Sequence, residues 1–419
     1  MKKSIRIILV TLFSAISWMN YAQERSLQFI RPAGQDGVNV FESPKEDTVN
    51  FEGVKVHLGG AFAIQFQALS NENSEDNLTA LGSDFNLPTA NLDLDAQLYD
   101  GIRMHLRTYL SSRNHQEAWV KGGHIQIDKL DFVKPGFLEG LMESISIRIG
   151  LDEFNYGDAH FRRTDNAHAI YNPFVGNYIM DSFSTEAFGE VTIQHSGFLG
   201  VIGLTNGKLN QNVTVNENTD NKPSFYGKLG YDNYVADDLR LRLTGSLYTN
   251  KGTSTGNNLY GGDRAGSRYY NIMTPVGEDA NFAEGRYNPR FTQLTAVQVN
   301  PFIKYKGLEL FGVFEIANNS DDQGNGSFTQ TAGELIYRFG MREQLYFGGR
   351  YNVVNGERTE GAPEMNISRT NIGAGWFLTK NILTKVEYVR QKYEGAGFAN
   401  TKYAGGAFQG LVIEAAIGF

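Results

Sequence analysis

The most regular feature of the chain is an alternation of apolar and polar residues with a period of two, the pattern of a β-strand whose two faces differ. Stretches of this kind, bounded by turn residues, number sixteen. They begin near Glu52, Thr89, Gly101, Gln116, Glu143, Ala187, Phe198, Pro223, Leu239, Thr295, Leu308, Thr329, Glu343, Ile367, Lys380 and Ala407. An even number of antiparallel strands can close into a barrel, so the pattern predicts an all-β fold of about sixteen strands.

The connections between these strands alternate in length. Long polar segments follow odd strands, at 70–88, 153–186, 207–222, 250–294 and 392–406, whereas the links at 112–115 and 318–326 are brief. Tight turns follow even strands, at 99–100, 196–197, 306–307, 340–342 and 378–379. The exception is 129–142, where we expect a short periplasmic helix. This alternation of long loops and tight turns is typical of a transmembrane barrel whose two ends differ, and it favours a barrel over a sandwich or propeller.

Both ends of the chain agree with a barrel in an outer membrane. Residues 1–22 combine three early cations with an apolar run over 7–16 and a small residue at Ala22, which is the layout of a cleaved signal peptide. Residues 23–50 are expected to form an extended periplasmic lead-in, and 51–419 the barrel. The last nine residues form an alternating strand that ends on Phe419, similar to the assembly signal of outer-membrane barrels. We therefore expect the outer membrane as the location and its lipid as the outer contact.

The net charge and the absence of cysteine argue against several classes of function. The formal net charge is −8. Loss of residues 1–22, which hold three cations and no acid, makes it −8 − 3 = −11. An acidic chain argues against nucleic acid as a partner. The chain has no cysteine, which excludes disulfides and thiolate chemistry.

Alternation also assigns side chains to the lumen. In the strand that starts near Gly101, Ile102, Met104, Leu106 and Leu110 suit lipid, so Arg103, His105 and Arg107 must point inward. The same argument directs Arg148, Lys228, Arg240 and Arg242 into the lumen. A charge on the lipid face costs roughly 2–4 kcal/mol near the membrane midplane. These residues predict a basic column along one side of the pore.

Acidic positions are expected on other parts of the wall. They are Asp93, Asp95, Glu190, Glu309, Glu315, Glu334, Glu387 and Glu414, partly matched by Lys55, Lys304, Arg338, Arg350, Arg369 and Lys385. Opposed acidic and basic walls would set up a transverse field that orients small polar solutes. The alternative is that the lumen charges only pair and keep the wall wetted.

The segment 153–186 has the composition of a pore constriction. It mixes large apolar residues with paired charges, unlike the polar loops at 70–88 and 207–222. Folding inward would bury its aromatic residues and present Asp158, Arg162, Arg163 and Asp165 to the pore. We therefore expect an inward-folded third external loop.

In this layout the chain resembles a sixteen-stranded bacterial outer-membrane porin, whose third external loop folds into the pore. Among such proteins it most resembles the phosphate-selective porin O/P type of Bacteroidetes, in which a signal ending in Ala-Gln, as at Ala22-Gln23, is frequent. The resemblance implies a pore lined by arginines and lysines, here the basic column with Arg162 and Arg163, and a homotrimer as the usual state. The acidic neighbours Asp158 and Asp165 depart from that type.

Other chemistry finds weaker support in the sequence. Asp158, His160, Asp165 and His168 could crowd a cation, but no metal-binding motif accompanies them, and no nucleophile or phosphate-binding motif is present. We therefore expect no metal, no cofactor and no enzyme activity. The sequence indicates a passive diffusion channel for small hydrophilic solutes or anions. The alternative is an occluded barrel that binds a partner in a surface or secretion assembly, because the segment 250–294 is rich in tyrosine and arginine.

Overall fold

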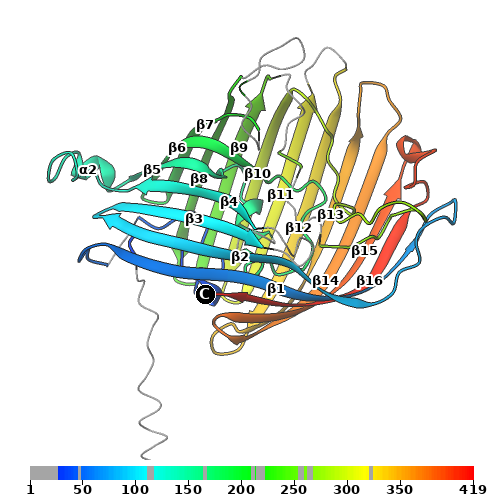
Figure 1. Ribbon diagram of the computed structural model, residues 1–419, viewed down its shortest axis with the longest axis horizontal. Helices are drawn as coiled ribbons and strands as arrows, with labels where there is room; N and C mark the ends of the chain where they lie inside the picture. Colours follow the sequence, from blue (N-terminus) through cyan, green and yellow to red (C-terminus); the bar gives the residue numbers. More distant parts are fainter. Residues whose placement is uncertain are drawn as a thin grey trace, which may run out of the picture.

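A computed structural model of the chain describes residues 27–45, 49–110, 118–163, 168–208, 213, 222–252, 259–261, 268–319 and 324–419. Within this part, sixteen strands form one closed antiparallel barrel in which every strand pairs with its neighbours in sequence (Figure 1). The last strand, β16, pairs with the first, β1, from Ala61 opposite Gly418 to Glu72 opposite Ala407. Closure leaves no free sheet edge. The expected sixteen-stranded barrel is confirmed.

The strands are β1 (Lys55–Glu72), β2 (Asp84–Tyr99), β3 (Ile102–Leu110), β4 (Trp119–Ile127), β5 (Ile145–Glu153), β6 (Thr185–His195), β7 (Phe198–Thr205), β8 (Ser224–Ala236), β9 (Leu239–Asn250), β10 (Leu294–Tyr305), β11 (Leu308–Asn319), β12 (Ser327–Phe339), β13 (Leu345–Glu357), β14 (Met365–Thr379), β15 (Ile382–Glu394) and β16 (Ala407–Gly418). The short helices are η1 (Gly34–Gly37), α2 (Glu139–Met142), η3 (Ala159–Arg162) and η4 (Ala396–Phe398). Every strand begins within five residues of its expected start, and α2 lies in the link where a short helix was expected. None of the described helices is long and apolar enough to cross a membrane.

Side chains alternate across the wall as the pleat of a strand requires. In β3, Arg103 and Arg107 point inward and are buried, whereas Leu106 and Leu110 point outward and are exposed. The outer face carries many exposed large apolar residues, among them Leu229, Leu243, Phe314, Leu335, Ile372 and Ile413. The inner face is mostly polar or charged. Each strand therefore has one face suited to an apolar environment and one that needs polar partners inside the barrel.

The two ends of the barrel differ. At one end, called here the tight-turn end, most strands are joined by short turns such as 100–101, 196–197 and 306–307. At the other, the long-loop end, lie the connections 73–83, 154–184, 251–293 and 395–406. The signal peptide expected over 1–22 and the loop residue Asp165 lie outside the described residues.

Three segments occupy the inside of the barrel. The first, residues 27–45, is called here the N-terminal strap. The second, residues 154–184 between β5 and β6, is called the inner loop, and each of its described residues is buried. The third is part of the connection between β9 and β10, residues 259–261 and 268–274, most of which are buried. The inward-folded third loop is thus confirmed, and it fills much of the lumen rather than forming a thin constriction.

Candidate functional site in the barrel lumen

The N-terminal strap crosses the tight-turn end of the lumen. On one side, the backbone N–H of Gln35 donates to the carbonyl of Lys380 at 2.7 Å, in the turn between β14 and β15. On the other side, the Lys45 ammonium lies 3.0 Å from the carboxylate of Asp128, just after β4. Between these points the ring of Phe41 is buried against Phe302 of β10. The segment expected as a lead-in is therefore held by several parts of the wall.

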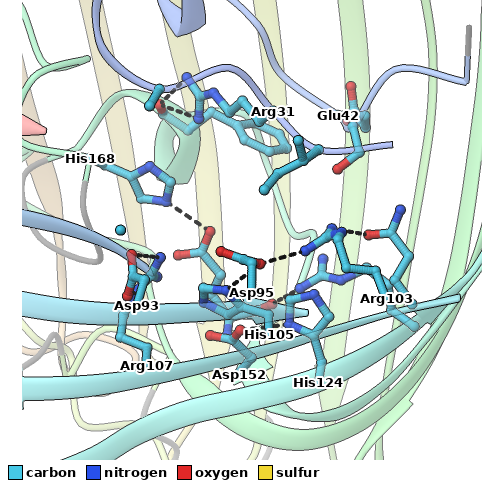
Figure 2. A pocket seen from close by; sticks show the side chains of 18 of the residues that line it. Arg31, Glu42, Asp93, Asp95, Arg103, His105, Arg107, His124, Asp152 and His168 are labelled. Carbon is cyan, nitrogen blue, oxygen red and sulfur yellow. Dashed lines mark hydrogen bonds and ion pairs between the residues drawn. The ribbon is translucent and has the colours of Figure 1, made fainter. Parts of the chain in front are cut away.

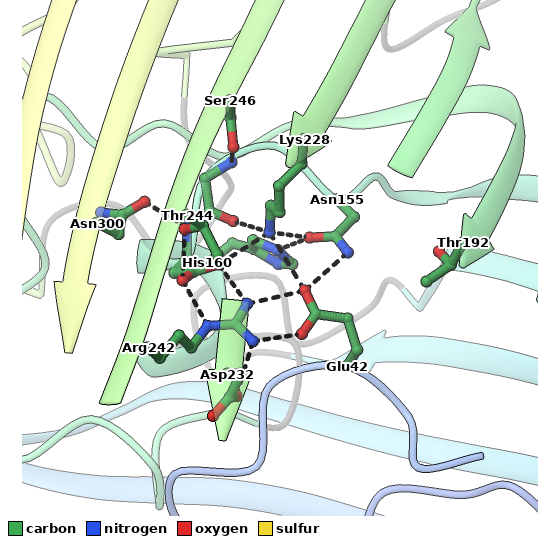
Figure 3. Close-up of polar contacts among 12 residues, drawn as sticks. Glu42, Asn155, His160, Thr192, Lys228, Asp232, Arg242, Thr244, Ser246 and Asn300 are labelled. Carbon is green, nitrogen blue, oxygen red and sulfur yellow. Dashed lines mark hydrogen bonds and ion pairs between the residues drawn. The ribbon is translucent and has the colours of Figure 1, made fainter. Parts of the chain in front are cut away.

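Glu42 of the strap joins a cluster of buried charges (Figure 3). Its carboxylate lies 2.8 Å from the Arg242 guanidinium and 3.5 Å from the Lys228 ammonium. The same two cations hold Asp158 of the inner loop, at 2.8 Å and 2.9 Å. Lys228, Arg242 and Asp158, which the sequence assigned to the pore lining, thus form one network, and Arg240 beside it pairs with Asp232 at 2.7 Å.

Opposite charges keep both carboxylates of this cluster ionised. Burial alone would raise the pKa of Glu42, but Arg242 and Lys228 outweigh it and lower the pKa to about 2. Burial also acts to raise the pKa of Asp158, and the same two cations hold it well below its usual range. A buried ion pair of this kind is costly to break by removing one partner. The cluster therefore fixes the strap and the inner loop to β8 and β9.

Arg162 and Arg163 of the inner loop also face carboxylates rather than open space. The Arg162 guanidinium lies 3.2 Å from the carboxylate of Glu334 in β12. Arg163 pairs with Asp181 within the loop at 2.6 Å and stacks over the ring of Phe183. Both arginines are buried. They stabilise the loop inside the barrel.

Wall residues of β13 and β15 form hydrogen bonds with the backbone of the inner loop. The Glu387 carboxylate accepts from the N–H of Val175 at 2.8 Å. The Lys385 ammonium donates to the carbonyl of Phe174 at 3.0 Å, and the Arg350 guanidinium to that of Gly176 at 2.7 Å. A Cβ at position 176 would lie 2.0 Å from the Tyr269 hydroxyl. Only glycine therefore fits where the inner loop passes Tyr269. This side of the lumen is filled.

The connection between β9 and β10 closes the same side from the long-loop end. The hydroxyl of Tyr269 donates to the Glu387 carboxylate at 2.7 Å, and that of Tyr260 to Glu315 at 2.9 Å. Arg268 pairs with Glu414 of β16. These contacts place loop side chains on the inward acids of β11, β15 and β16.

A cavity of about 220 Å³ remains beside β1 to β6 (Figure 2). Its wall holds ion pairs between neighbouring strands, with Arg103 and Asp95 at 2.9 Å and Arg107 and Asp93 at 2.7 Å. Arg148 of β5 faces Glu190 of β6 at 3.5 Å. The basic column is thus interleaved with carboxylates, which differs from the opposed walls that the sequence suggested. Adjacent strands place the two signs side by side.

Carboxylates outnumber arginines in the lining of this cavity. Six carboxylates line it, those of Glu42, Asp93, Asp95, Asp152, Glu153 and Glu190, together with four arginines, Arg31, Arg103, Arg107 and Arg148. With neutral histidines the side chains carry an excess of two negative charges. The cavity lining is therefore not predominantly positive.

Histidines add titratable groups to the cavity. His105 contacts Asp95 at 3.0 Å, His124 contacts Asp152 at 2.8 Å, and His168 of the inner loop contacts Glu153 at 3.0 Å. Burial lowers the pKa of His168 against the pull of Glu153. Among the described residues, no three His, Asp or Glu side chains converge as metal ligands. Each of these three histidines instead contacts one carboxylate.

Sequence reasoning missed the strap. Arg31 stacks over Tyr171 at 3.8 Å, and its guanidinium donates to the carbonyl of Gly37 at 2.9 Å. Asn39 donates to Glu309 at 2.5 Å. The signal that could have placed the strap inside the barrel is its mixture of Phe41, Glu42 and other charged residues without strand periodicity. The same kind of mixture identified the inner loop.

Comparisons with known proteins place the fold. No family model matches the chain, and a search of curated proteins gives no match. Outer-membrane expressed OmpT of Vibrio cholerae superposes with a TM-score of 0.52 at 9% identity, covering 88% of this chain and 99% of its own. The outer membrane channel DcaP of Acinetobacter baumannii gives 0.52 at 11% identity, covering 88% and 98%. OmpF of Salmonella typhi, in a complex with daunomycin, gives 0.50 at 12% identity, covering 88% and 98%.

These identities establish a shared fold and nothing finer. The chain therefore has the architecture of bacterial outer-membrane β-barrels, and one of the barrels with this architecture is described as a channel. What the chain does with that architecture has to be argued from its own lumen.

Proposed function

We propose that the chain is an outer-membrane channel for small hydrophilic solutes, whose pathway is the cavity beside β1 to β6. The exposed apolar residues of the outer wall support a membrane location, because a face of this kind is stable against lipid rather than water. The shared fold with the outer membrane channel DcaP supports transport as the role. A signal peptide over 1–22 belongs to the same proposal.

The observation that carries the proposal is the charged cavity inside the closed wall. Apolar packing fills the opposite side, with buried residues such as Val175, Ile179 and Met180 of the inner loop. The cavity side instead presents carboxylates, guanidinium groups and imidazoles to a space of about 220 Å³. Charged walls keep a passage wet, and such a volume suits solutes of a few heavy atoms.

The pairing of arginines with carboxylates in the lining argues for weak ion selectivity in this proposal. A phosphate-selective pore needs cations that are not already paired, whereas Arg103 and Arg107 each have a carboxylate partner in the cavity wall. We therefore propose passage of small polar or zwitterionic solutes in preference to phosphate. Assembly into a homotrimer stays a prediction.

A second candidate function follows from the packing of the lumen. Every described residue of the inner loop is buried, and the strap crosses the tight-turn end. An occluded barrel that anchors a partner would need this filling, and would conduct no ions. The two candidates therefore differ in whether the barrel conducts ions, which a conductance measurement can decide.

The test is single-channel conductance and reversal potential of the purified protein in planar bilayers under a salt gradient. Small, stable steps with weak selectivity are expected from the wild-type chain. Deletion of residues 158–166 removes Asp158, Arg162 and Arg163, and should increase the conductance because the inner loop loses its anchors.

Folding must be checked in parallel, by heat-dependent electrophoretic migration and circular dichroism. Well-folded wild-type barrels that never conduct would overturn the channel and favour the occluded barrel. A folded deletion variant with unchanged conductance would show that the inner loop does not border the pathway.

A further inference from the structure

A second pocket lies at the long-loop end, far along the chain from the cavity residues. Its volume is about 540 Å³. Three loops wall it: the connection between β9 and β10 through residues 281–290, the connection between β13 and β14 through Arg358, and the connection between β15 and β16 through residues 397–403. We call it the mouth pocket. Its position gives it access from outside the barrel.

Two exposed arginines mark the mouth pocket. Arg290 and Arg358 line it and are exposed, and neither forms an ion pair within the described part of the chain. Arg286 lines it as well. The acid of the pocket, Glu284, is engaged by Lys402 and accepts from the N–H of Met273 at 2.6 Å. The pocket is therefore a local concentration of positive charge on an acidic protein.

Aromatic rings form the floor and one side of this pocket. Tyr393 lies 4.7 Å from Tyr403 and 5.5 Å from Phe398, ring centre to ring centre, and Phe398 lies 5.8 Å from Tyr403. Tyr393 and Phe398 are buried, so the three rings form a fixed surface. Asn281, Asn288 and Thr401 add amide and hydroxyl groups to the lining.

We propose that the mouth pocket binds an acidic saccharide, with Arg290 and Arg358 holding the carboxylate and the ring of Tyr403 packing against the sugar. A guanidinium fork matches a carboxylate in geometry and charge. An aromatic ring covers the apolar face of a sugar while amides and hydroxyls meet its edges. A simple inorganic anion would use the arginines but would leave the aromatic wall without a role.

This proposal goes beyond the channel function, because the mouth pocket can bind its ligand whether or not the barrel conducts. Binding is therefore measured on the purified full chain in detergent by isothermal titration calorimetry, without any conductance readout. The probe is glucuronate, with glucose as the uncharged sugar and inorganic sulfate as the anion without a ring. Failure of the channel in bilayers leaves this test unaffected.

Glucuronate should bind more tightly than either glucose or sulfate. The double variant Arg290→Ala with Arg358→Ala should weaken glucuronate binding at least about tenfold, because charge-assisted hydrogen bonds are lost. Tyr403→Leu should weaken glucuronate but leave any sulfate binding unchanged. Arg342→Ala is the matched control, since Arg342 is exposed in the turn between β12 and β13 at the opposite end.

Three results would overturn the proposal. The first is no binding of glucuronate to the wild-type chain. The second is equal binding by the wild type and a folded double arginine variant, which would place the ligand elsewhere. The third is sulfate binding as tight as glucuronate binding, with no effect of Tyr403→Leu, which would reduce the pocket to a plain anion site.

Discussion

The two halves of the lumen use the same residue types for different purposes. Along β2 to β6, Arg103, Arg107 and Arg148 pair with acids on the neighbouring strand, and space remains in front of these pairs. Along β12 to β16, wall charges also pair between neighbouring strands, as Arg350 does with Glu334, but they bond to the loops as well, as Glu387 does to the backbone of Val175. A buried charge needs a partner in both halves. Where the wall charges bond only within the wall, space remains in the lumen.

The difference lies in whether the wall charges also bond to a loop. An ion pair within the wall needs no third segment, so a loop gains little by approaching it. Wall charges that bond to loop backbone hold that loop in place, and apolar side chains such as Ile179 then fill the space around it. The position of the cavity follows from this division rather than from the count of charges.

The largest expected effect is the loss of a charge that ties the inner loop to the packed half. Glu334→Gln keeps the size of the side chain but leaves Arg162 and Arg350 facing a neutral amide. Removing one partner from a buried pair costs about 3–5 kcal/mol. We expect a lower thermal midpoint in detergent and larger or noisier conductance steps, as the inner loop is released.

The matched control is Asp238→Asn, which breaks the pair between Lys306 and Asp238. Both side chains are more than half exposed, at 63% and 58%, and exposed pairs contribute roughly 0–1 kcal/mol. An equal fall in the thermal midpoint for the two variants would contradict the role assigned to Glu334.

A smaller effect is expected on acidification, through Glu42 of the strap. The folded pKa of Glu42, about 2, lies below its ordinary value near 4.5. Its contribution to docking is therefore fully present above about pH 4.5 and is lost as the pH falls towards 2. We expect the strap to loosen over this window, because protonation removes the charge that faces Arg242 and Lys228.

A spin label on Ser43→Cys can report this change, since the chain has no other cysteine. The label should gain mobility as the pH falls from 4.5 towards 2. In the Glu42→Gln background the label should already be more mobile at neutral pH, and this step should shrink. A label whose mobility is the same at all pH values in both backgrounds would remove Glu42 as the anchor of the strap.

The same comparison shows how much of the lumen could be predicted from the sequence. Period-two alternation was enough to direct Arg103, His105 and Arg107 inward. Their partners were harder to predict, because counting from the tight turn at 100–101 alone would set Asp95 opposite Leu106. A register shift between Gln97 and Tyr99 instead sets Asp93 opposite Arg107 and Asp95 opposite His105. The interleaved charges of the wall therefore follow from an irregularity that the turn residues do not indicate.

Contacts of the inner loop and of the strap could not be predicted, for a physical reason. Glu334 meets Arg162, and Glu42 meets Arg242, across long stretches of chain whose path no local rule fixes. The inner loop could be recognised by its apolar content, but its direction inside the barrel depends on side chains from several distant strands. The strap has no periodicity at all, so only the assembled wall shows where it lies.

The smallest expected effect concerns selectivity on the open half. Arg103→Ala with Arg107→Ala would leave Asp93 and Asp95 without their arginine partners, and so should shift the reversal potential under a KCl gradient toward cations. Asp93→Asn with Asp95→Asn should shift it toward anions by a similar amount, because the wild-type pairs balance. Arg342→Ala, in a turn away from the cavity, serves as the control. If neither double variant moves the reversal potential while both barrels conduct, ions do not pass along β2 and β3, and the pathway has to be sought on the half that the loops fill.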